Sequence, residues 1–285
     1  MNLENKNQLL SYPKSNDFDG RIQLAYEGRE NVVNIPKVKN AGKVFSEEGV
    51  RYQIMFNGLR MQADMYYGKW MTELIEKLHG HHEPQEEKAF YECLNHINNG
   101  TSMIELGGYW GFYSLWFKSK FKDSKVILTE PNPKNLAVGH ENAKLNKLEI
   151  ITELGGVFKD KDAPFGMIKQ KCYCNVPSVN VEKLMKKYFI EELDILHADI
   201  QGAEHYMLEQ SENVLRKAKV NYIFISTHSE ALHSKCLHAL NTFGYNIATQ
   251  HTPAESYSFD GLIVASSPRR EKITTFITVS PYRKS

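Results

Sequence analysis

The chain has 285 residues, of which 41% are hydrophobic and 24% are charged, and its formal net charge is +1. This composition is typical of a globular protein with one large domain, and a charge so close to zero argues against a nucleic-acid-binding protein. No apolar run reaches the roughly 18 residues of a membrane span, and the first residues, MNLENKNQLLSYPK, do not have the pattern of a signal peptide.

The sequence contains four cysteines, Cys93, Cys172, Cys174 and Cys236, and none of them belongs to a CxxC pair. A disulfide framework is not expected in a chain of this length. We therefore expect a protein of the reducing cytoplasm. The spacing of Cys172 and Cys174 places both on one face of a strand, where we expect them to pack.

The first part of the chain, residues 1–80, is expected to form a small accessory layer. Residues 1–45 are polar and weakly periodic. Residues 50–78 begin with the alternation of a strand and end with apolar side chains at helical spacing. These helical apolar positions are Met71, Leu74, Ile75 and Leu78.

A histidine-rich stretch, HGHHE at residues 79–83, follows the accessory layer. Its composition resembles a metal cluster, but the adjacent side chains of His81 and His82 must diverge, so we expect a solvated loop. The next stretch, residues 86–97, has apolar side chains three and four positions apart, which predicts a helix.

Residues 81–267 alternate short apolar runs with helical stretches, the signature of a doubly wound α/β sheet. We expect strands at Met103–Leu106, Val126–Thr129, Ile150–Thr152, Ile195–Ala198, Tyr222–Ser226, Tyr245–Thr249 and Gly261–Ala265. The last two read as a hairpin, so the predicted fold is a mostly parallel seven-stranded sheet with one antiparallel strand. The tail, residues 268–285, is expected to pair with a sheet edge or with a partner subunit.

The first predicted strand of this sheet runs into a glycine turn, in the sequence MIELGGYWGFYSLWF. Glu105 lies at the end of the strand, and Gly107, Gly108 and Gly111 follow. The dinucleotide pattern GxGxxG does not fit, because two glycines are adjacent and the acid precedes the turn. The pattern E-x-G-x-x-x-G is the commoner form for S-adenosylmethionine, whose methionine end lies over this turn. We expect a Cβ at Gly107 to obstruct the ligand more than the fold.

A second acid ends the next predicted strand, in KVILTEPNPKN. Glu130 follows Glu105 by 25 residues, and a carboxylate at this place can accept hydrogen bonds from both hydroxyls of an adenosine ribose. Pro131 and Asn132 continue this turn as cofactor contacts. Tyr109, or another aromatic residue of the glycine turn, is placed to contact the sulfonium. The alternative is that the first acid caps a turn and the second merely begins a loop.

These motifs and two later ones resemble the FkbM-type methyltransferases, over about residues 82–265. MIELGGYWGFYSL is similar to the first motif of the family and TEPNPKNLAVGHENAKLN to the second. VPSVNVEKLMKKYFIEELDILHADIQGAEHYML is similar to the most distinctive motif, and YIFISTH to the following strand. The resemblance implies a Rossmann-like fold that binds S-adenosylmethionine. It also implies O-methylation of a sugar or sugar nucleotide, in bacterial capsule or surface polysaccharide biosynthesis.

The resemblance also bears on individual site residues. HEPQEE resembles the segment before the first strand of the family, which places Glu86 near the ammonium group of the methionine. Two residues depart from the family pattern, because Gln201 stands where Glu is frequent and His197 where Lys is frequent. Both are expected near the reaction centre.

Asp199 and His228 end neighbouring predicted strands, so their side chains should meet at the carboxyl edge of the sheet. We expect them to be the catalytic residues, either as ligands of one divalent ion or as an acid–base pair. The loop QHTPAESYSFDG offers His251, Glu255 and Asp260 as further ligands. Two histidines and one carboxylate suit iron(II) or manganese(II), with magnesium as a further choice, so the expected metal ligands are Asp199, His228 and His251.

The residues leave alternatives open. His228 could act as the general base without a metal ion. A nicotinamide-dependent oxidoreductase on a Rossmann fold, and a cofactor-binding subunit without catalysis, are two further functions. The expected partner is a sugar or sugar-nucleotide acceptor rather than a nucleic acid, and a homo-oligomer is compatible with the sequence.

Overall fold

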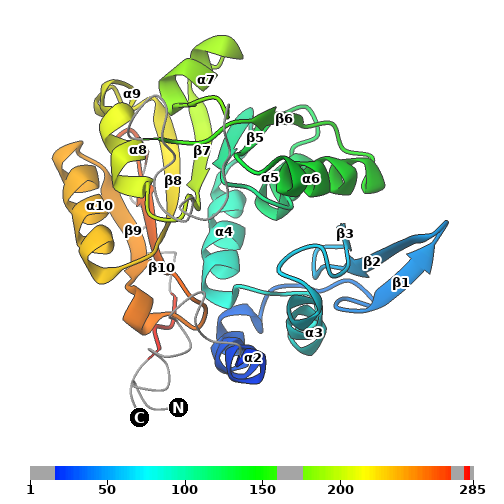
Figure 1. Ribbon diagram of the computed structural model, residues 1–285. Helices are drawn as coiled ribbons and strands as arrows, with labels where there is room; N and C mark the ends of the chain where they lie inside the picture. The colour runs from blue at the N-terminus through cyan, green and yellow to red at the C-terminus, as the bar shows by residue number, and fades with distance from the viewer. Residues whose placement is uncertain (1–16, 159–175, 271–278, 283–285) are drawn as a thin grey trace.

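The computed structural model describes residues 17–158, 176–270 and 279–282, and its centre is a seven-stranded sheet with the order β6-β5-β4-β7-β8-β10-β9 (Figure 1). Its strands are β4 (Ser102–Leu106), β5 (Lys125–Glu130), β6 (Ile151–Leu154), β7 (Leu193–Ala198), β8 (Val220–Thr227), β9 (Asn246–His251) and β10 (Gly261–Ser266). Only β10 in this sheet is antiparallel to its neighbours. The predicted mostly parallel sheet with one antiparallel strand is confirmed.

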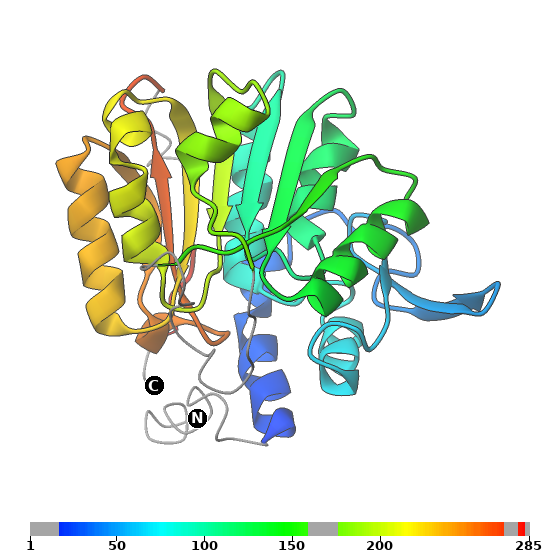
Figure 2. The same ribbon diagram turned by 45° about the horizontal axis from the view of Figure 1, so that its top comes forward.

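The inner strands are apolar along their whole length because both faces of the sheet are covered. Every residue of β4, β7, β8 and β10 is buried, as expected for strands between two helix layers. Figure 2 shows the strands between these layers. One layer contains α4 (Pro84–His96), α5 (Phe112–Lys120) and α6 (Pro133–Leu145). The other contains α7 (Val181–Lys187), α8 (Glu204–Gln210), α9 (Glu212–Arg216) and α10 (Glu230–Thr242).

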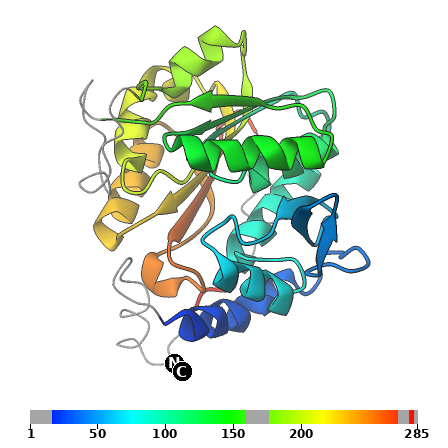
Figure 3. The same cartoon turned by 45° about the vertical axis from the view of Figure 1, so that its right-hand side comes forward.

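The N-terminal part forms the accessory layer that the sequence predicts. It contains a three-stranded antiparallel sheet and two helices, packed beside the main sheet (Figure 3). The elements are α2 (Phe18–Glu27), η1 (Gly28–Val32), β1 (Val44–Glu47), β2 (Val50–Ile54), β3 (Arg60–Gln62) and α3 (Lys69–Lys77). The sequence did not predict α2, because it lies within residues 1–45, which as a whole are polar and weakly periodic.

Two asparagines of α6 attach the accessory layer to the main sheet. Asn142 accepts a hydrogen bond from the backbone N–H of Gln62, and Asn146 accepts one from the backbone N–H of Arg60, both at 2.8 Å. These bonds satisfy backbone groups of β3 on the side that faces α6. The accessory layer is therefore held in a defined position over the main sheet.

The prediction of a solvated loop at residues 79–83 is wrong. His81 and His82 are buried, and both pair with the buried carboxylate of Glu87 in α4. Burial alone would lower the pKa of His82, but the charges of Glu83 and Glu87 raise it to about 10. The histidine-rich stretch is thus a buried ionic network, which joins the accessory layer to the first helix of the main sheet.

In the C-terminal tail, the described residues 279–282 contact the accessory layer and α4, and Arg270 pairs with Glu192 at 3.4 Å. Ser280 exchanges hydrogen bonds with the side chain of Asn31, and its carbonyl also accepts from Gln85. Cys93 and Cys236 are buried free thiols, whereas Cys172 and Cys174 lie outside the described residues. Among the described helices, none has the length and apolar character that crossing a membrane requires.

Candidate cofactor and acceptor site

A cavity of about 500 Å³ lies at the carboxyl ends of β4, β5, β7 and β8. This is where a doubly wound sheet binds its ligand. Nine of the residues expected from the sequence line it: Glu86, Glu105, Gly107, Gly108, Tyr109, Glu130, Pro131, Asn132 and Asp199. Gly111, His228 and His251 are not among its lining residues. The sequence motifs thus converge on one cavity.

The glycine turn is shaped by the protein as much as by a ligand. Gly107 has a φ of +77°, and a Cβ at this position would lie 1.9 Å from the carbonyl oxygen of Asp199. The expectation that a Cβ would obstruct the ligand more than the fold is therefore wrong. Gly111, with a φ of +78°, begins α5 and packs closely on Leu128, so its role is to support the turn.

Glu105 lies at the base of the cavity. Its Oε2 accepts a hydrogen bond of 2.9 Å from the backbone N–H of Ser114, in the first turn of α5. Burial raises the pKa of Glu105, although the charge of His197 and this hydrogen bond oppose the shift. The same carboxylate thus stabilises the start of α5 and offers its remaining lone pairs to a ligand in the cavity.

Glu130 lies at the end of β5, on the opposite side of the glycine turn. Its carboxylate accepts hydrogen bonds from the backbone N–H groups of Tyr109, at 3.3 Å, and Asn132, at 2.9 Å. Burial raises the pKa of Glu130 to about 7. Asn132 also caps α6 through a bond from the N–H of Lys134. This end of the cavity is held in place by backbone hydrogen bonds.

Glu86 reaches the cavity from α4. Its Oε1 lies 2.6 Å from Nε2 of His197, and its Oε2 accepts from the hydroxyl of Ser226 at 3.3 Å. Burial raises the pKa of Glu86, against the stabilising effect of His197, while Glu86 raises the pKa of His197 against the effect of burial. The side chain that the resemblance places near the methionine ammonium therefore already has a buried histidine as its partner.

Asp199 and His228 meet as predicted. Nε2 of His228 lies 3.2 Å from Oδ1 of Asp199 and 3.4 Å from Oδ1 of Asp260, while Nδ1 lies 3.0 Å from Oε1 of Glu204. Burial lowers the pKa of His228, but the three surrounding carboxylates raise it well above its usual value. Burial raises the pKa of Asp260 to about 8. Ligand atoms of Asp199, Glu204 and His228 lie within 4.8 Å of one another, with Glu204 at Nδ1 of the imidazole and Asp199 and Asp260 at Nε2.

His251 is not part of this cluster. It ends β9 and pairs with Leu262 of β10, which pairs in turn with Ser226 of β8. Strand β10 therefore separates His251 from the end of β8, and two strand spacings amount to about 10 Å. The sequence could not show this, because the insertion of β10 between β8 and β9 is a property of the sheet order. Glu204 and Asp260 contact the ring nitrogens of His228, where His251 was expected to lie.

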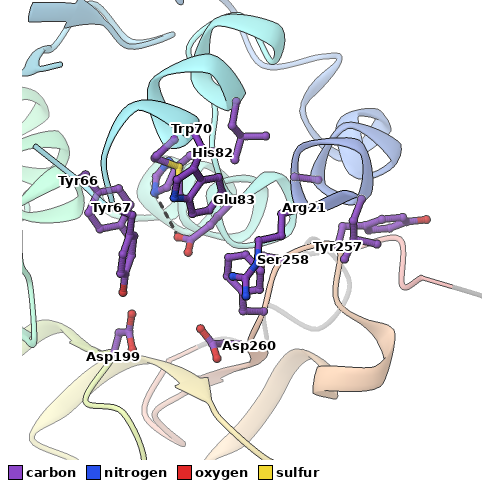
Figure 4. Close-up of a pocket in the computed structure, with 15 residues that line it drawn as sticks. Arg21, Tyr66, Tyr67, Trp70, His82, Glu83, Asp199, Tyr257, Ser258 and Asp260 are labelled. Carbon is purple, nitrogen blue, oxygen red and sulfur yellow. Dashed lines mark ion pairs between the residues drawn. The ribbon is translucent and has the colours of Figure 1, made fainter. Parts of the chain in front are cut away.

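A smaller pocket of about 30 Å³ adjoins the cavity on the side of the accessory layer (Figure 4). The residues that sequence reasoning missed here come from the accessory layer and the loop before β10; they are Arg21, Tyr66, Tyr67, Trp70 and Phe259. In Figure 4, Asp199 and Asp260 lie across the pocket from Tyr66, Tyr67 and Trp70. In the sequence, the dipeptide Tyr66-Tyr67 before Gly68 could have indicated this pocket, because paired aromatic residues in a turn are unusual in a polar segment.

Three non-glycine residues that line the cavity have a left-handed backbone. Their φ values are 52° at Tyr67, 43° at Tyr109 and 55° at Gln201. Such conformations cost about 1–3 kcal/mol each and gather at functional sites. Tyr67 and Tyr109 also contact each other, with ring centroids 5.5 Å apart. Of the three, Tyr67 also lines the smaller pocket.

Comparisons with known proteins agree with this geometry. Residues 92–247, more than half of the chain, match the Methyltransferase FkbM domain. A comparison with curated proteins finds no match.

Similar solved structures include the METTL16 methyltransferase domain, with a TM-score of 0.47, 13% identity, and coverage of 76% of this chain and 86% of that one. Another is M. capricolum TrmK in complex with S-adenosylhomocysteine, with a TM-score of 0.41, 16% identity, and coverage of 64% and 71%. The match over residues 92–247 and the seven-stranded fold lead to one conclusion. The chain belongs to the FkbM methyltransferase family and is an S-adenosylmethionine-dependent methyltransferase.

Proposed function

We propose that this enzyme methylates a hydroxyl group of a sugar or sugar nucleotide, with the help of a divalent metal ion, in bacterial capsule or surface polysaccharide biosynthesis. The biosynthetic setting is supported by the family resemblance alone. The observation that carries the proposal is the position of Nε2 of His228 between two carboxylates, 3.2 Å from Asp199 and 3.4 Å from Asp260, beside an aromatic pocket.

We place the sugar ring where the smaller pocket adjoins the large cavity, because about 30 Å³ alone holds little more than one water molecule, and Tyr66, Tyr67 and Asp199 line both spaces. Trp70 and Phe259 lie with ring centroids 6.1 Å apart, and both line the pocket. Aromatic rings offer large flat apolar surfaces, on which the C–H face of a sugar can pack. The carboxylates of Asp199 and Asp260 lie opposite and can accept hydrogen bonds from sugar hydroxyls. The pocket thus combines the two kinds of contact that a sugar needs.

The large cavity fits S-adenosylmethionine, which supplies the methyl group when it is bound. Glu130 is placed to accept hydrogen bonds from the ribose, and Glu86 and Glu105 to accept from the methionine ammonium. These residues hold the donor, while Asp199 lines both the cavity and the smaller pocket.

A metal ion fits the histidine–carboxylate cluster. His228 supplies a nitrogen ligand, and Asp199 and Asp260 supply oxygen ligands, a set that suits divalent ions of the first transition row. Glu204 lies at Nδ1 of His228 and fixes which ring nitrogen faces the ion, as carboxylates behind metal-binding histidines do. A divalent ion held here would lower the pKa of the acceptor hydroxyl.

The metal-independent alternative assigns proton removal to a side chain. His228 is poorly suited to this role, because its raised pKa keeps the imidazole protonated near neutral pH. Burial raises the pKa of Asp260 to about 8, so this carboxyl is also mostly protonated at pH 7. Without a metal ion, neither side chain is a ready proton acceptor at neutral pH, and this favours metal assistance.

Chelation separates the two mechanisms. The enzyme is incubated with EDTA, desalted, and assayed on a panel of sugar nucleotides with and without iron(II), manganese(II) or magnesium. We expect activity to disappear and to return with one of these ions. Asp199→Asn should lose metal and turnover but bind S-adenosylhomocysteine within about threefold of the wild type, since one neutral hydrogen bond is worth about 1 kcal/mol or less. His251→Ala, matched as a histidine outside the cluster, should keep its metal.

Two outcomes would contradict the proposal. Full activity of the stripped enzyme, with no metal by elemental analysis, rules out metal assistance. Methylation of a non-carbohydrate acceptor, with no transfer to any sugar in the panel, rules out the sugar substrate.

A further inference from the structure

The charges that line the large cavity are unbalanced. Five carboxylic acids line it, namely Glu83, Glu86, Glu105, Glu130 and Asp199. Within the described ranges, no lysine or arginine does so. The basic side chains among its lining residues are two imidazoles, His82 and His197. A ligand with its own carboxylate therefore has few partners in this cavity.

The backbone of the glycine turn offers few donors, because the N–H groups of Gly107, Gly108, Tyr109 and Gly111 already donate within the protein. The N–H groups of Gly107 and Gly108 donate to the carbonyl oxygen of Thr129, at 2.9 and 3.1 Å. The N–H of Tyr109 donates to the carboxylate of Glu130, and that of Gly111 to the carbonyl of Gly108. A side-chain donor is thus needed for an anionic group at this end of the cavity.

The two imidazoles differ in what they have left to donate. Both ring nitrogens of His82 lie next to carboxylates, Nε2 at 3.2 Å from Glu83 and Nδ1 at 2.6 Å from Glu87, although the contact at Nδ1 does not have hydrogen-bond geometry. His197 uses only Nε2, at 2.6 Å from Glu86. Its Nδ1 is buried and has no hydrogen-bond partner among the described residues. An orphaned buried polar atom in a binding cavity indicates that a ligand completes its hydrogen bonding.

Neighbouring aromatic rings hold the ring of His197 in one orientation, and this fixes the direction of Nδ1. It stacks on Tyr113, with centroids 4.4 Å apart, and lies parallel to Phe224 at 6.1 Å. On the sheet it is paired with Glu105 of β4 and lies two residues before Asp199. Side chains two residues apart on a strand share a face, so His197 lies about 7 Å deeper in the cavity than Asp199. This depth places it beside Glu105 and Glu86.

The methionine part of S-adenosylmethionine carries one ammonium and one carboxylate. Glu86 and Glu105 provide for the ammonium, and they leave the carboxylate without a cation. We infer that His197 binds the methionine carboxylate of S-adenosylmethionine through Nδ1, while Nε2 remains bonded to Glu86. His197 is then a cofactor-binding residue that selects the zwitterionic end of the donor. This inference depends on donor binding and not on the identity of the acceptor or the metal.

The test compares two ligands by calorimetry, S-adenosylhomocysteine and its decarboxylated analogue, which keeps the ammonium and lacks the carboxylate. A hydrogen bond to a charged group is worth a factor of roughly ten to a hundred in affinity. We expect the wild-type enzyme to prefer S-adenosylhomocysteine by about that factor. His197→Gln keeps an amide nitrogen near the position of Nε2 but has none at Nδ1, so its preference should fall below about threefold.

Matched variants make the result specific. His197→Asn places its amide nitrogen near the position of Nδ1 and should retain most of the preference. His233→Asn removes another buried histidine, whose ring nitrogens bond Thr227 and Gln250 away from the cavity, and should leave the preference unchanged. If either His197 variant does not fold, the ¹⁵N resonance of Nδ1 in the wild type should shift with S-adenosylhomocysteine and not with the decarboxylated analogue.

The outcomes distinguish this inference from the proposed function. An equal preference in the wild type and in His197→Gln, or no preference in the wild type, overturns the role of His197. Neither result affects methylation of a sugar, which the acceptor assay measures separately.

Discussion

At the cofactor end of the cavity, the turn of residues 107–109 and Glu130 are tied together by backbone hydrogen bonds within one sheet. At the acceptor end, the walls are side chains from segments far apart in the chain, α2, α3 and the loop before β10. Bonds between adjacent strands fix a position regardless of most side chains, whereas a wall made of side chains changes with each substitution. The backbone of the sheet thus determines the donor site, whereas the side chains of the accessory layer and the loop before β10 determine the proposed acceptor site.

Substitution of Gly107 should have the largest effect, because it disturbs the donor turn and the fold together. In Gly107→Ala the new Cβ meets the carbonyl oxygen of Asp199 at 1.9 Å on a backbone with a φ of +77°. We expect a loss of about 2–6 kcal/mol in unfolding free energy, measured by chemical denaturation. Gly49→Ala, with a φ of +80° and open space around it, is the control for the backbone conformation and should lose about 1–2 kcal/mol. Equal losses in the two variants would show that the close approach to Asp199 does not matter.

Glu130→Ala tests the donor end without disturbing the turn glycines. The loss of a charged hydrogen-bond acceptor should weaken S-adenosylhomocysteine binding by roughly ten- to a hundredfold, as measured by calorimetry. Glu141→Ala removes an exposed carboxylate of the adjacent helix and should not change the affinity. Unchanged affinity in Glu130→Ala would remove this carboxylate from the ribose site.

The pH dependence of S-adenosylhomocysteine binding is a second test of the role of Glu130. Burial raises the pKa of Glu130 to about 7 in the free enzyme, and ribose hydroxyls stabilise its ionised form. S-adenosylhomocysteine affinity should therefore rise with pH through about 7 and level off above it, by at most about tenfold between pH 6 and pH 8. Glu130→Gln has no such group to ionise and should show a flatter profile. The same slope in the wild type and the variant would assign the proton to another residue.

The smallest effect is expected at the acceptor wall. Trp70 lines only the smaller of the two pockets, so under the proposed function Trp70→Leu should raise the KM of the acceptor by about two- to tenfold, the value of one aromatic contact. Its affinity for S-adenosylhomocysteine should stay constant in calorimetry. Phe45→Leu, at a partly exposed aromatic of the same accessory layer outside the pocket, is the matched control. A weaker donor affinity in Trp70→Leu would mean that the two ends are not separate.

The sequence by itself determined the α/β fold, the donor turn and the meeting of Asp199 with His228. Each depends on a local pattern, an apolar strand followed by a glycine or an acid, and parallel strands bring their carboxyl ends together. The placement of Glu105 and Glu130 around one cavity follows from the same rule. These features could be predicted because they need no knowledge of which distant side chains pack together.

Only the tertiary structure decided the rest. His251 was expected beside His228, but β10 lies between their strands, and strand order is set by packing across the whole sheet. His81 and His82 were expected in solvent, but both are buried and contact the carboxylate of Glu87 in the interior. Pairing a buried charge compensates the cost of removing it from water, and a linear pattern cannot show which carboxylate folds back to provide it. For the same reason, the aromatic wall of the smaller pocket could not be predicted, because it depends on how the accessory layer packs against the sheet.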